Sequence, residues 1–237
     1  MPANKIKIDN AILKRYQKQS TRRKKRIILC NILIVCEGTE TEPKYFAAFR
    51  KFNRGTIVYN LEIEGRGENT IQVVDRAIEL RDKNKGTERE YDRVWAVFDK
   101  DDFDKNFNKA INKAESNNIS CAWSNEAFEL WYLYHFLNRI TAMSRDEYKK
   151  SISKAVNRSP LYKSKEPYEY KKNDEQNYEI MNKYGSQKEA INNAMSQSLY
   201  YSDKCYAKHN PCTMVYKLVL QLIGEDSELN EELKNKI

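Results

Sequence analysis

A nearly continuous apolar run at residues 26–36 constrains the fold more than any other part of the sequence. The run, Arg26-Ile-Ile-Leu-Cys-Asn-Ile-Leu-Ile-Val-Cys36, is rich in β-branched residues and ends at Glu37-Gly38. Apolar side chains on both faces of a strand are typical of a parallel sheet, because helices cover both of its faces. The sequence therefore predicts a buried strand in an α/β protein.

Strand and helix patterns alternate through the first 140 residues. We expect helices opening at Thr41-Glu42-Pro43 and covering 69–81, 103–116 and 125–136, and further strands at 56–64, 93–98 and 119–123. Such alternation requires βαβ crossovers. The fold class predicted is α/β, a mainly parallel sheet flanked by helices.

The pattern changes beyond about residue 140, where no clear strand appears. Ser144 with Glu147 and Ser186 with Glu189 match the capping box that begins many helices. Residues 162–177 read as a mobile connection, 212–223 as a final apolar helix and 225–237 as a charged tail. We therefore divide the chain into a basic segment (1–26), an α/β core (27–140) and a helical C-terminal region (141–237) packed on the core.

The net charge of +8 comes entirely from the first 26 residues. They hold ten basic side chains and one acid, whereas the remaining residues carry 32 basic and 33 acidic side chains. A basic segment of this kind grips phosphates by releasing counterions, or serves as a solvated tail that keeps the protein in solution. The candidate nucleic-acid-binding residues are the densest cluster: Arg22, Arg23, Lys24, Lys25 and Arg26.

The location of the protein is predicted from two missing patterns. No apolar run approaches the ~20 residues that span a bilayer, and the first 25 residues lack the apolar stretch of a signal peptide. We expect a cytoplasmic protein without a membrane partner.

Acidic residues follow two of the predicted strands. Glu37 comes after Val35-Cys36, and Asp99-Lys-Asp101 comes after Val97-Phe98. The carboxyl ends of parallel strands meet at one edge of a sheet, and an all-oxygen set suits Mg²⁺ or Mn²⁺. The alternative from spacing alone is that these acids are solvated loop residues, with Asp102 or Asp104 capping the next helix.

The amino-acid sequence of these stretches is similar to a known motif. Ile-Leu-Ile-Val-Cys-Glu37-Gly38-x-x-x-Glu42-Pro-x-Tyr-Phe, followed by Val-Phe-Asp99-x-Asp101, resembles the TOPRIM pattern of topoisomerases, primases and OLD-type nucleases. The version here resembles the RloB-like family of bacterial defence proteins. Further matches are Ser124-Asn125-x-x-Phe128-Glu129-x-Trp131-x-Leu-x-His135-Phe136 and Asn210-Pro211-x-Thr213-x-Val215, so that the resemblance covers most of residues 27–220. Glu126 departs from the proline expected there, at what we take as the first helical position.

The resemblance implies a TOPRIM fold and a metal-dependent nuclease that cleaves DNA or RNA, including tRNA, in phage defence or abortive infection. It implies that Glu37 is a general acid/base or metal ligand and that Asp99 and Asp101 hold Mg²⁺. Glu129 and His135 match the family's helix and become second-tier candidates, with a buried core histidine as the alternative for His135. The chain has no P-loop, so an AAA- or ABC-type ATPase partner would supply any ATP hydrolysis.

A rival function of a different class is a non-catalytic module that binds nucleic acid or protein and keeps the TOPRIM fold. Three carboxylates in one cleft repel one another unless a cation is present. A pure binder has no need of them, which favours the enzyme.

Overall fold

The computed structural model describes residues 28–51, 53–54, 57–65, 67, 69–100 and 104–235. The basic segment 1–26 and Asp101 lie outside these residues.

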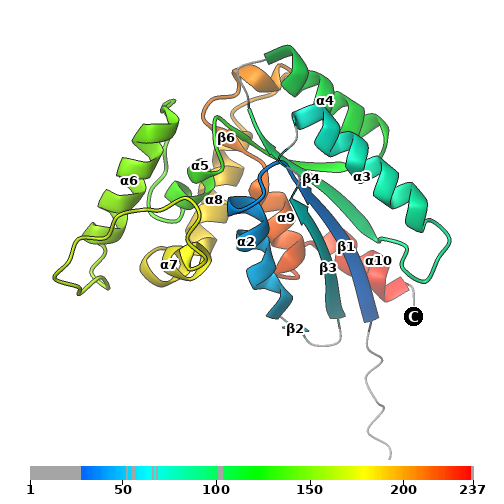
Figure 1. Ribbon diagram of the computed structural model, residues 1–237, viewed down its shortest axis with the longest axis horizontal. Coiled ribbons are helices and arrows are strands. Elements are labelled where there is room, and N and C mark those ends of the chain that lie inside the picture. Colours follow the sequence, from blue (N-terminus) through cyan, green and yellow to red (C-terminus); the bar gives the residue numbers. More distant parts are fainter. Residues whose placement is uncertain are drawn as a thin grey trace, which may run out of the picture.

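A six-stranded sheet in the order β2-β3-β1-β4-β5-β6 forms the centre of the protein (Figure 1). The four inner strands, β3, β1, β4 and β5, are parallel, and the two-residue strands β2 and β6 pair antiparallel at the edges. The mainly parallel sheet predicted from the sequence is confirmed. The strands are β1 (Ile28–Cys36), β2 (Asn53–Arg54), β3 (Ile57–Gly65), β4 (Arg93–Asp99), β5 (Ser120–Asn125) and β6 (Cys212–Thr213).

Helices cover both faces of the sheet, as Figure 1 shows. One face packs against α3 (Thr70–Asn84) and α4 (Asp104–Ser116), with Leu33 and Phe98 in that core. The opposite face packs against the helices α2 (Thr41–Ala47), α5 (Glu129–Tyr134), α8 (Gln187–Ser198) and α9 (Val215–Leu222). Because successive side chains of a strand point to opposite faces, the strands β1, β4 and β5 contribute residues to both cores.

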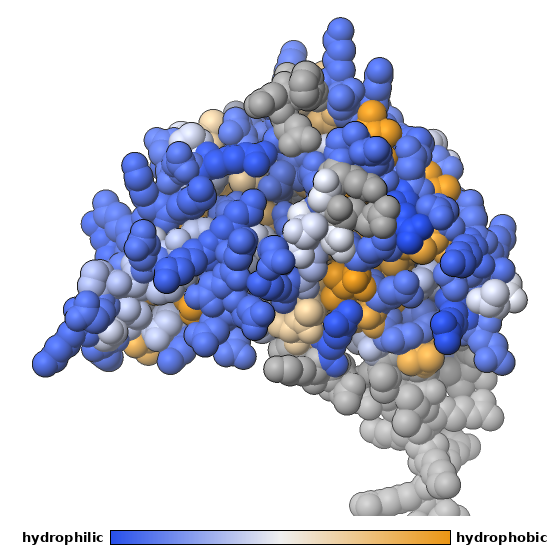
Figure 2. All heavy atoms as spheres, in the orientation of Figure 1, coloured by the Kyte–Doolittle hydropathy of each residue, from blue (hydrophilic) through white to orange (hydrophobic). Residues whose placement is uncertain are grey.

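A helical lobe extends the core on the α2 and α9 side, which we call the second core, away from the sheet. It consists of α6 (Arg145–Arg158), α7 (Asn177–Tyr184) and the connection between them, residues 159–176, which we call the strap. Tyr148, Ile152 and Met181 join the lobe to the same core as α2 and α9. Hydrophilic residues cover most of the face of the lobe that Figure 2 shows.

Sequence and structure differ at three elements. α5 begins at Glu129 rather than residue 125, because Ser124 and Asn125 continue β5 and pair with β6; Glu126 therefore precedes the helix. The predicted helix from residue 212 begins instead with strand β6. The predicted charged tail contains α10 (Ser227–Asn235), which buries Leu229 and Leu233. No described helix combines the length and apolarity needed to cross a membrane.

Candidate active site

Glu37 and Asp99 lie at the carboxyl ends of two adjacent strands where the chain changes direction across the sheet. From β1 the chain passes through α2 to β3 on one side, and from β4 it passes through α4 to β5 on the other. Open α/β sheets bind ligands at such a switch point. The Glu37 amide donates to the carbonyl of Val97 (2.9 Å), and the Asp99 amide donates to Glu37 Oε2 (3.0 Å). The structure thus brings these two predicted residues together.

The side chains of β4 point alternately to the two faces of the sheet, and this alternation determines the face toward which Asp99 points. Trp95 and Val97 belong to the core on the α2 and α5 side, and Asp99 has the same parity along the strand. Its side chain is 8% exposed. Asp99 is therefore a buried carboxylate on the side of the sheet that α2 and α5 cover.

Glu42 is a further carboxylate of this site, which our sequence prediction did not include. It lies in the first turn of α2 and is 4% exposed, and its Oε2 accepts no hydrogen bond from the described residues. A Cβ at residue 38 would overlap this oxygen and come within 2.9 Å of Glu42 Cδ, so a glycine there makes room for the carboxylate. The signal for Glu42 was its place in line with Tyr45 and Phe46 on the buried face of α2, where an unpaired charge is costly.

Glu129 enters the site from the first turn of α5. It is 3% exposed, and the hydroxyl of Tyr170 on the strap donates to its Oε1 (3.2 Å). The charge of Glu129 acts on both Glu42 and Asp99. This second-tier candidate therefore belongs to the same acidic site, which we define as Glu37, Glu42, Asp99 and Glu129.

Burial and like charges shape the electrostatics of the acidic site. Loss of solvent raises the pKa of Asp99 well above its usual range, and the charges of Glu42, Glu129 and Glu37 raise it further. Burial also raises the pKa of Glu42, and Glu129 adds to that rise while Lys172 and Arg145 oppose it. Carboxylates that repel one another in a buried site are stabilised by a cation.

The donor chemistry of the acidic site fits a hard divalent cation. All its donors are carboxylate oxygens, the ligands that Mg²⁺ and Mn²⁺ prefer, and one of them is the buried, unpartnered Oε2 of Glu42. Across the ranges that the structure describes, no three Asp, Glu, His or Cys side chains already stand together as a metal-binding set. Asp101, the third predicted ligand, lies outside those ranges.

His135 lies away from the acidic site, just past the C-terminal end of α5. Its Nδ1 lies 3.0 Å from the carbonyl of Trp131, its carbonyl accepts from the Ser186 amide, and it is 2% exposed. Burial lowers the pKa of His135 to about 4. These surroundings are those of a neutral histidine within the core. The other predicted group, Arg22, Arg23, Lys24, Lys25 and Arg26, lies outside the described residues.

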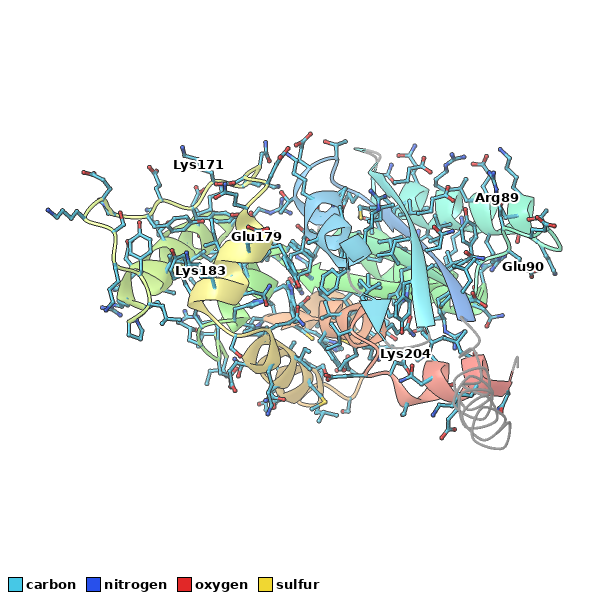
Figure 3. The ribbon with its side chains drawn as sticks, turned by 90° about the horizontal axis from the view of Figure 1, so that it is seen from below. Arg89, Glu90, Lys171, Glu179, Lys183 and Lys204 are labelled. Atoms are coloured by element: carbon cyan, nitrogen blue, oxygen red, sulfur yellow. The ribbon has the colours of Figure 1, made fainter. Side chains whose placement is uncertain are left out.

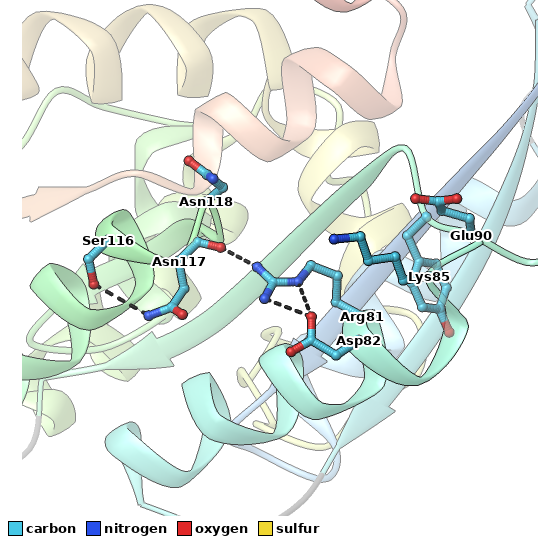
Figure 4. Close-up of a pocket in the computed structure, with 8 residues that line it drawn as sticks. Arg81, Asp82, Lys85, Glu90, Ser116, Asn117 and Asn118 are labelled. Atoms are coloured by element: carbon cyan, nitrogen blue, oxygen red, sulfur yellow. Dashed lines mark hydrogen bonds and ion pairs between the residues drawn. The ribbon is translucent and has the colours of Figure 1, made fainter. Parts of the chain in front are cut away.

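A cavity of about 420 Å³ lies at the opposite, amino-terminal end of β4 and β5 (Figure 4). Its Arg81 already bonds Asp82 and the carbonyl of Asn117. No buried, unpartnered side-chain atom lies among its lining residues. We therefore assign no chemistry to this cavity and keep the acidic site as the candidate active site.

Comparison with known proteins supports the resemblance read from the sequence. The family model described as RloB-like protein matches residues 32–222, which is most of the chain and spans all four residues of the acidic site. No curated protein and no solved structure matches the chain.

Proposed function

The chain belongs to the RloB-like family, and from that premise we propose that it is a metal-dependent, TOPRIM-type nuclease that cleaves the phosphodiester backbone of DNA or RNA. The observation that supports the proposal is the position of four acids from four different segments around the sheet's switch point, where the Asp99 amide bonds Glu37 and the charges of Glu42 and Glu129 act on Asp99. Such a concentration of charge is costly in a binding module but useful to an enzyme that holds a cation against phosphate.

In this proposal Glu37, Asp99 and Asp101 hold Mg²⁺ or Mn²⁺, with Glu42 and Glu129 completing the negative surroundings. A bound divalent ion would stabilise the negative charge that develops on a phosphoryl group. Glu37 is half-buried and one of its oxygens is fixed by the Asp99 amide, so it is oriented and still reachable from solvent. Besides its place among the metal ligands, Glu37 is the residue that we assign to proton transfer, as general acid or base.

The proposed cellular role is phage defence or abortive infection in the cytoplasm, with tRNA among the candidate substrates. A toxic nuclease needs restraint, and the chain has no P-loop of its own. We therefore propose an AAA- or ABC-type ATPase as the controlling partner, and the basic segment 1–26 as an additional contact with nucleic acid.

The test is incubation of the purified protein with plasmid DNA, total RNA and tRNA, each with Mg²⁺, with Mn²⁺ and with a chelator. We expect cleavage of at least one substrate that requires the metal. The triple variant Glu37→Gln, Asp99→Asn, Asp101→Asn should lose it, because each amide keeps the shape of the carboxylate without its charge.

The matched control is Glu88→Gln, which makes the same change at an exposed turn that precedes β4, at the far end of the sheet. It should cleave like the wild type. Cleavage by the triple variant at the wild-type rate would place the active site elsewhere. Metal binding without cleavage of any substrate would favour the rival function, a non-catalytic binding module.

A further inference from the structure

Two cationic residues of the helical lobe are attached beside the acidic site. Arg145, the first residue of α6, donates through Nη2 to the carbonyl of Lys100 (3.2 Å), the residue after Asp99. Lys172 on the strap accepts at its carbonyl from Thr41 Oγ1 (3.2 Å), the residue before Glu42. The side chain of Arg145 is thus bonded next to Asp99, and the backbone of Lys172 is bonded next to Glu42.

The strap is held firmly enough to position Lys172. Asn157 on α6 forms two hydrogen bonds with the backbone of Tyr168, at 2.8 and 2.9 Å, and Ser153 Oγ accepts from the Tyr170 amide (2.9 Å). At its other end, Lys44 on α2 donates to the carbonyl of Asn173 (3.1 Å). Figures 1 and 3 show the strap running along the lobe toward α2, and Figure 3 labels Lys171 on it. Helix α6 and the strap therefore carry both cations as one unit.

The charged ends of both residues remain available. Arg145 and Lys172 are exposed, and neither forms an ion pair within the described part of the chain. Arg145 uses Nη2 for the carbonyls of Lys100 and Glu126, which leaves Nε and Nη1 for another acceptor. Both positive charges nevertheless act on the acidic site, since each opposes the rise in the pKa of Glu42.

A nucleic-acid backbone needs cations of this kind at such a site. Four carboxylates repel a phosphodiester, and a divalent ion among them neutralises only part of their charge. Arginine presents a planar fork that matches two phosphate oxygens, and lysine acts as a compact point charge. Arg145 is bonded beside Asp99 and Lys172 lies beside Glu42, so the two cations offer two separate contacts to the phosphates of one strand.

We propose that Arg145 and Lys172 form a phosphate clamp, through which the helical lobe holds the sugar-phosphate backbone of the substrate over the acidic site. This inference rests on the proposed function for the identity of the ligand, a nucleic-acid backbone. The competing explanation is that the two cations only neutralise the acids within the protein.

The experiment measures binding rather than cleavage. Fluorescently labelled tRNA and a short labelled DNA duplex are titrated with the full-length protein in chelator and over a range of salt concentrations. The test variant is Arg145→Gln, Lys172→Gln. The matched control is Arg158→Gln, Lys165→Gln, which removes one arginine from the far end of α6 and one exposed lysine from the strap, with the same loss of charge.

The expected result is a loss of affinity of at least about 10-fold in the test variant at 0.1 M salt, because each lost phosphate contact removes about one counterion from the binding equilibrium. The slope of log affinity against log salt should fall by roughly 1.5 for two contacts. The control variant should keep the wild-type slope. Loss with one probe but not the other would identify RNA or DNA as the backbone that the clamp holds.

Unchanged affinity and slope for both probes would overturn the clamp, and so would a wild-type protein that binds neither probe. If the cations are only internal counterions, the test variant should instead lose thermal stability in chelator while binding normally. Should the double variant fail to fold, Arg145→Lys and Lys172→Met replace it; the first keeps the charge and should retain the salt slope. Binding without cleavage by the wild type would refute the proposed nuclease while leaving the clamp tested.

Discussion

At residue 38 the absence of a Cβ determines where the Glu42 carboxylate can lie. A methyl group there would overlap Glu42 Oε2, and the buried surroundings of α2 leave this side chain little room to move aside. Gly38→Ala should therefore destabilise the protein by about 1–3 kcal/mol, the usual cost of overpacking. Urea unfolding measures this free energy.

The double variant Gly38→Ala, Glu42→Ala tests whether Glu42 is the cause. Removing Oε2 and Cδ removes the atoms that the new methyl group meets. The double variant should then be more stable than the sum of the two single changes predicts, by about 1 kcal/mol or more. Additive effects would show that residue 38 matters for some reason other than the position of Glu42.

His135 should make the protein sensitive to mild acid. Its pKa is lowered to about 4 by burial, whereas an unfolded chain binds that proton near pH 6.5. Above pH 6.5 His135 is neutral in both the folded and the unfolded state, so its contribution to the free energy of unfolding is fully present. That contribution is lost as the pH falls from 6.5 to 4, by about 3 kcal/mol in total. In urea unfolding at several pH values, His135→Phe should show a shallower loss of stability over this window. An identical pH dependence would mean that His135 takes up its proton normally in the folded protein.

At the scale of elements, Asn157 provides two of the hydrogen bonds that attach the strap to α6. Asn157→Ala removes both hydrogen bonds to Tyr168, each worth about 1 kcal/mol, and deletes no apolar side chain from either core. Limited proteolysis should therefore cut the strap faster in this variant, and the melting temperature should fall by no more than about 4–8 °C. Asn182→Ala, which removes a side-chain bond to Tyr178 within α7, is the control. Equal cleavage rates in the two variants would show that Asn157 does not fasten the strap.

The elements that were predicted correctly carry the predictive pattern within their own residues. The apolar run became β1, and Asn69 caps α3 in a capping box with Gln72, as Ser144 and Glu147 do for α6. The ends of strands placed Glu37 and Asp99 at one edge of the sheet, because parallel strands leave no other arrangement. These signals are local in sequence.

The elements that were missed depend on partners far away in the sequence. β6 has only two residues, too few to alternate, and exists because Thr213 and Cys212 pair with Ser124 and Asn125. α10 carries two leucines among polar residues, and burial against the second core stabilises them by about 1.5–3 kcal/mol each. The strap reads as a polar linker for the same reason: its hydrogen bonds go to residues of α2, α5 and α6. Lys172 and Arg145 could not be connected to the site without those contacts.

At the scale of the whole molecule, charge is divided between the basic segment and the rest of the chain. Residues 1–26 carry ten basic side chains, whereas the remainder has a net charge of −1. Deleting residues 1–26 should weaken the binding of nucleic acid and flatten its salt dependence, since fewer counterions are released. Titrations of labelled tRNA at several salt concentrations measure both. An unchanged affinity and slope would leave the segment as a feature of solubility.

A divalent ion should stabilise the molecule as one unit, because the core beneath the acidic site is continuous from β1 to α10. At one hundred times its dissociation constant, a ligand of the folded state adds about 2.7 kcal/mol, or roughly 5–10 °C in melting temperature for a chain of this size. Mg²⁺ or Mn²⁺ should therefore raise a single melting transition by about this much. Asp99→Asn should abolish the shift, and Glu88→Gln should keep it.

The behaviour of Asp99→Asn in chelator separates loss of metal from loss of fold. The pKa of Asp99 is raised in the folded protein, so the folded state holds a proton that the unfolded chain releases above about pH 4. The stability of the metal-free wild type is therefore lost as the pH rises from about 4 through the raised pKa, whereas an amide at this position has no proton to lose. At neutral pH in chelator the variant should melt at or above the wild-type temperature. A variant that melts lower there, or that still responds to the metal, would remove Asp99 from the metal site.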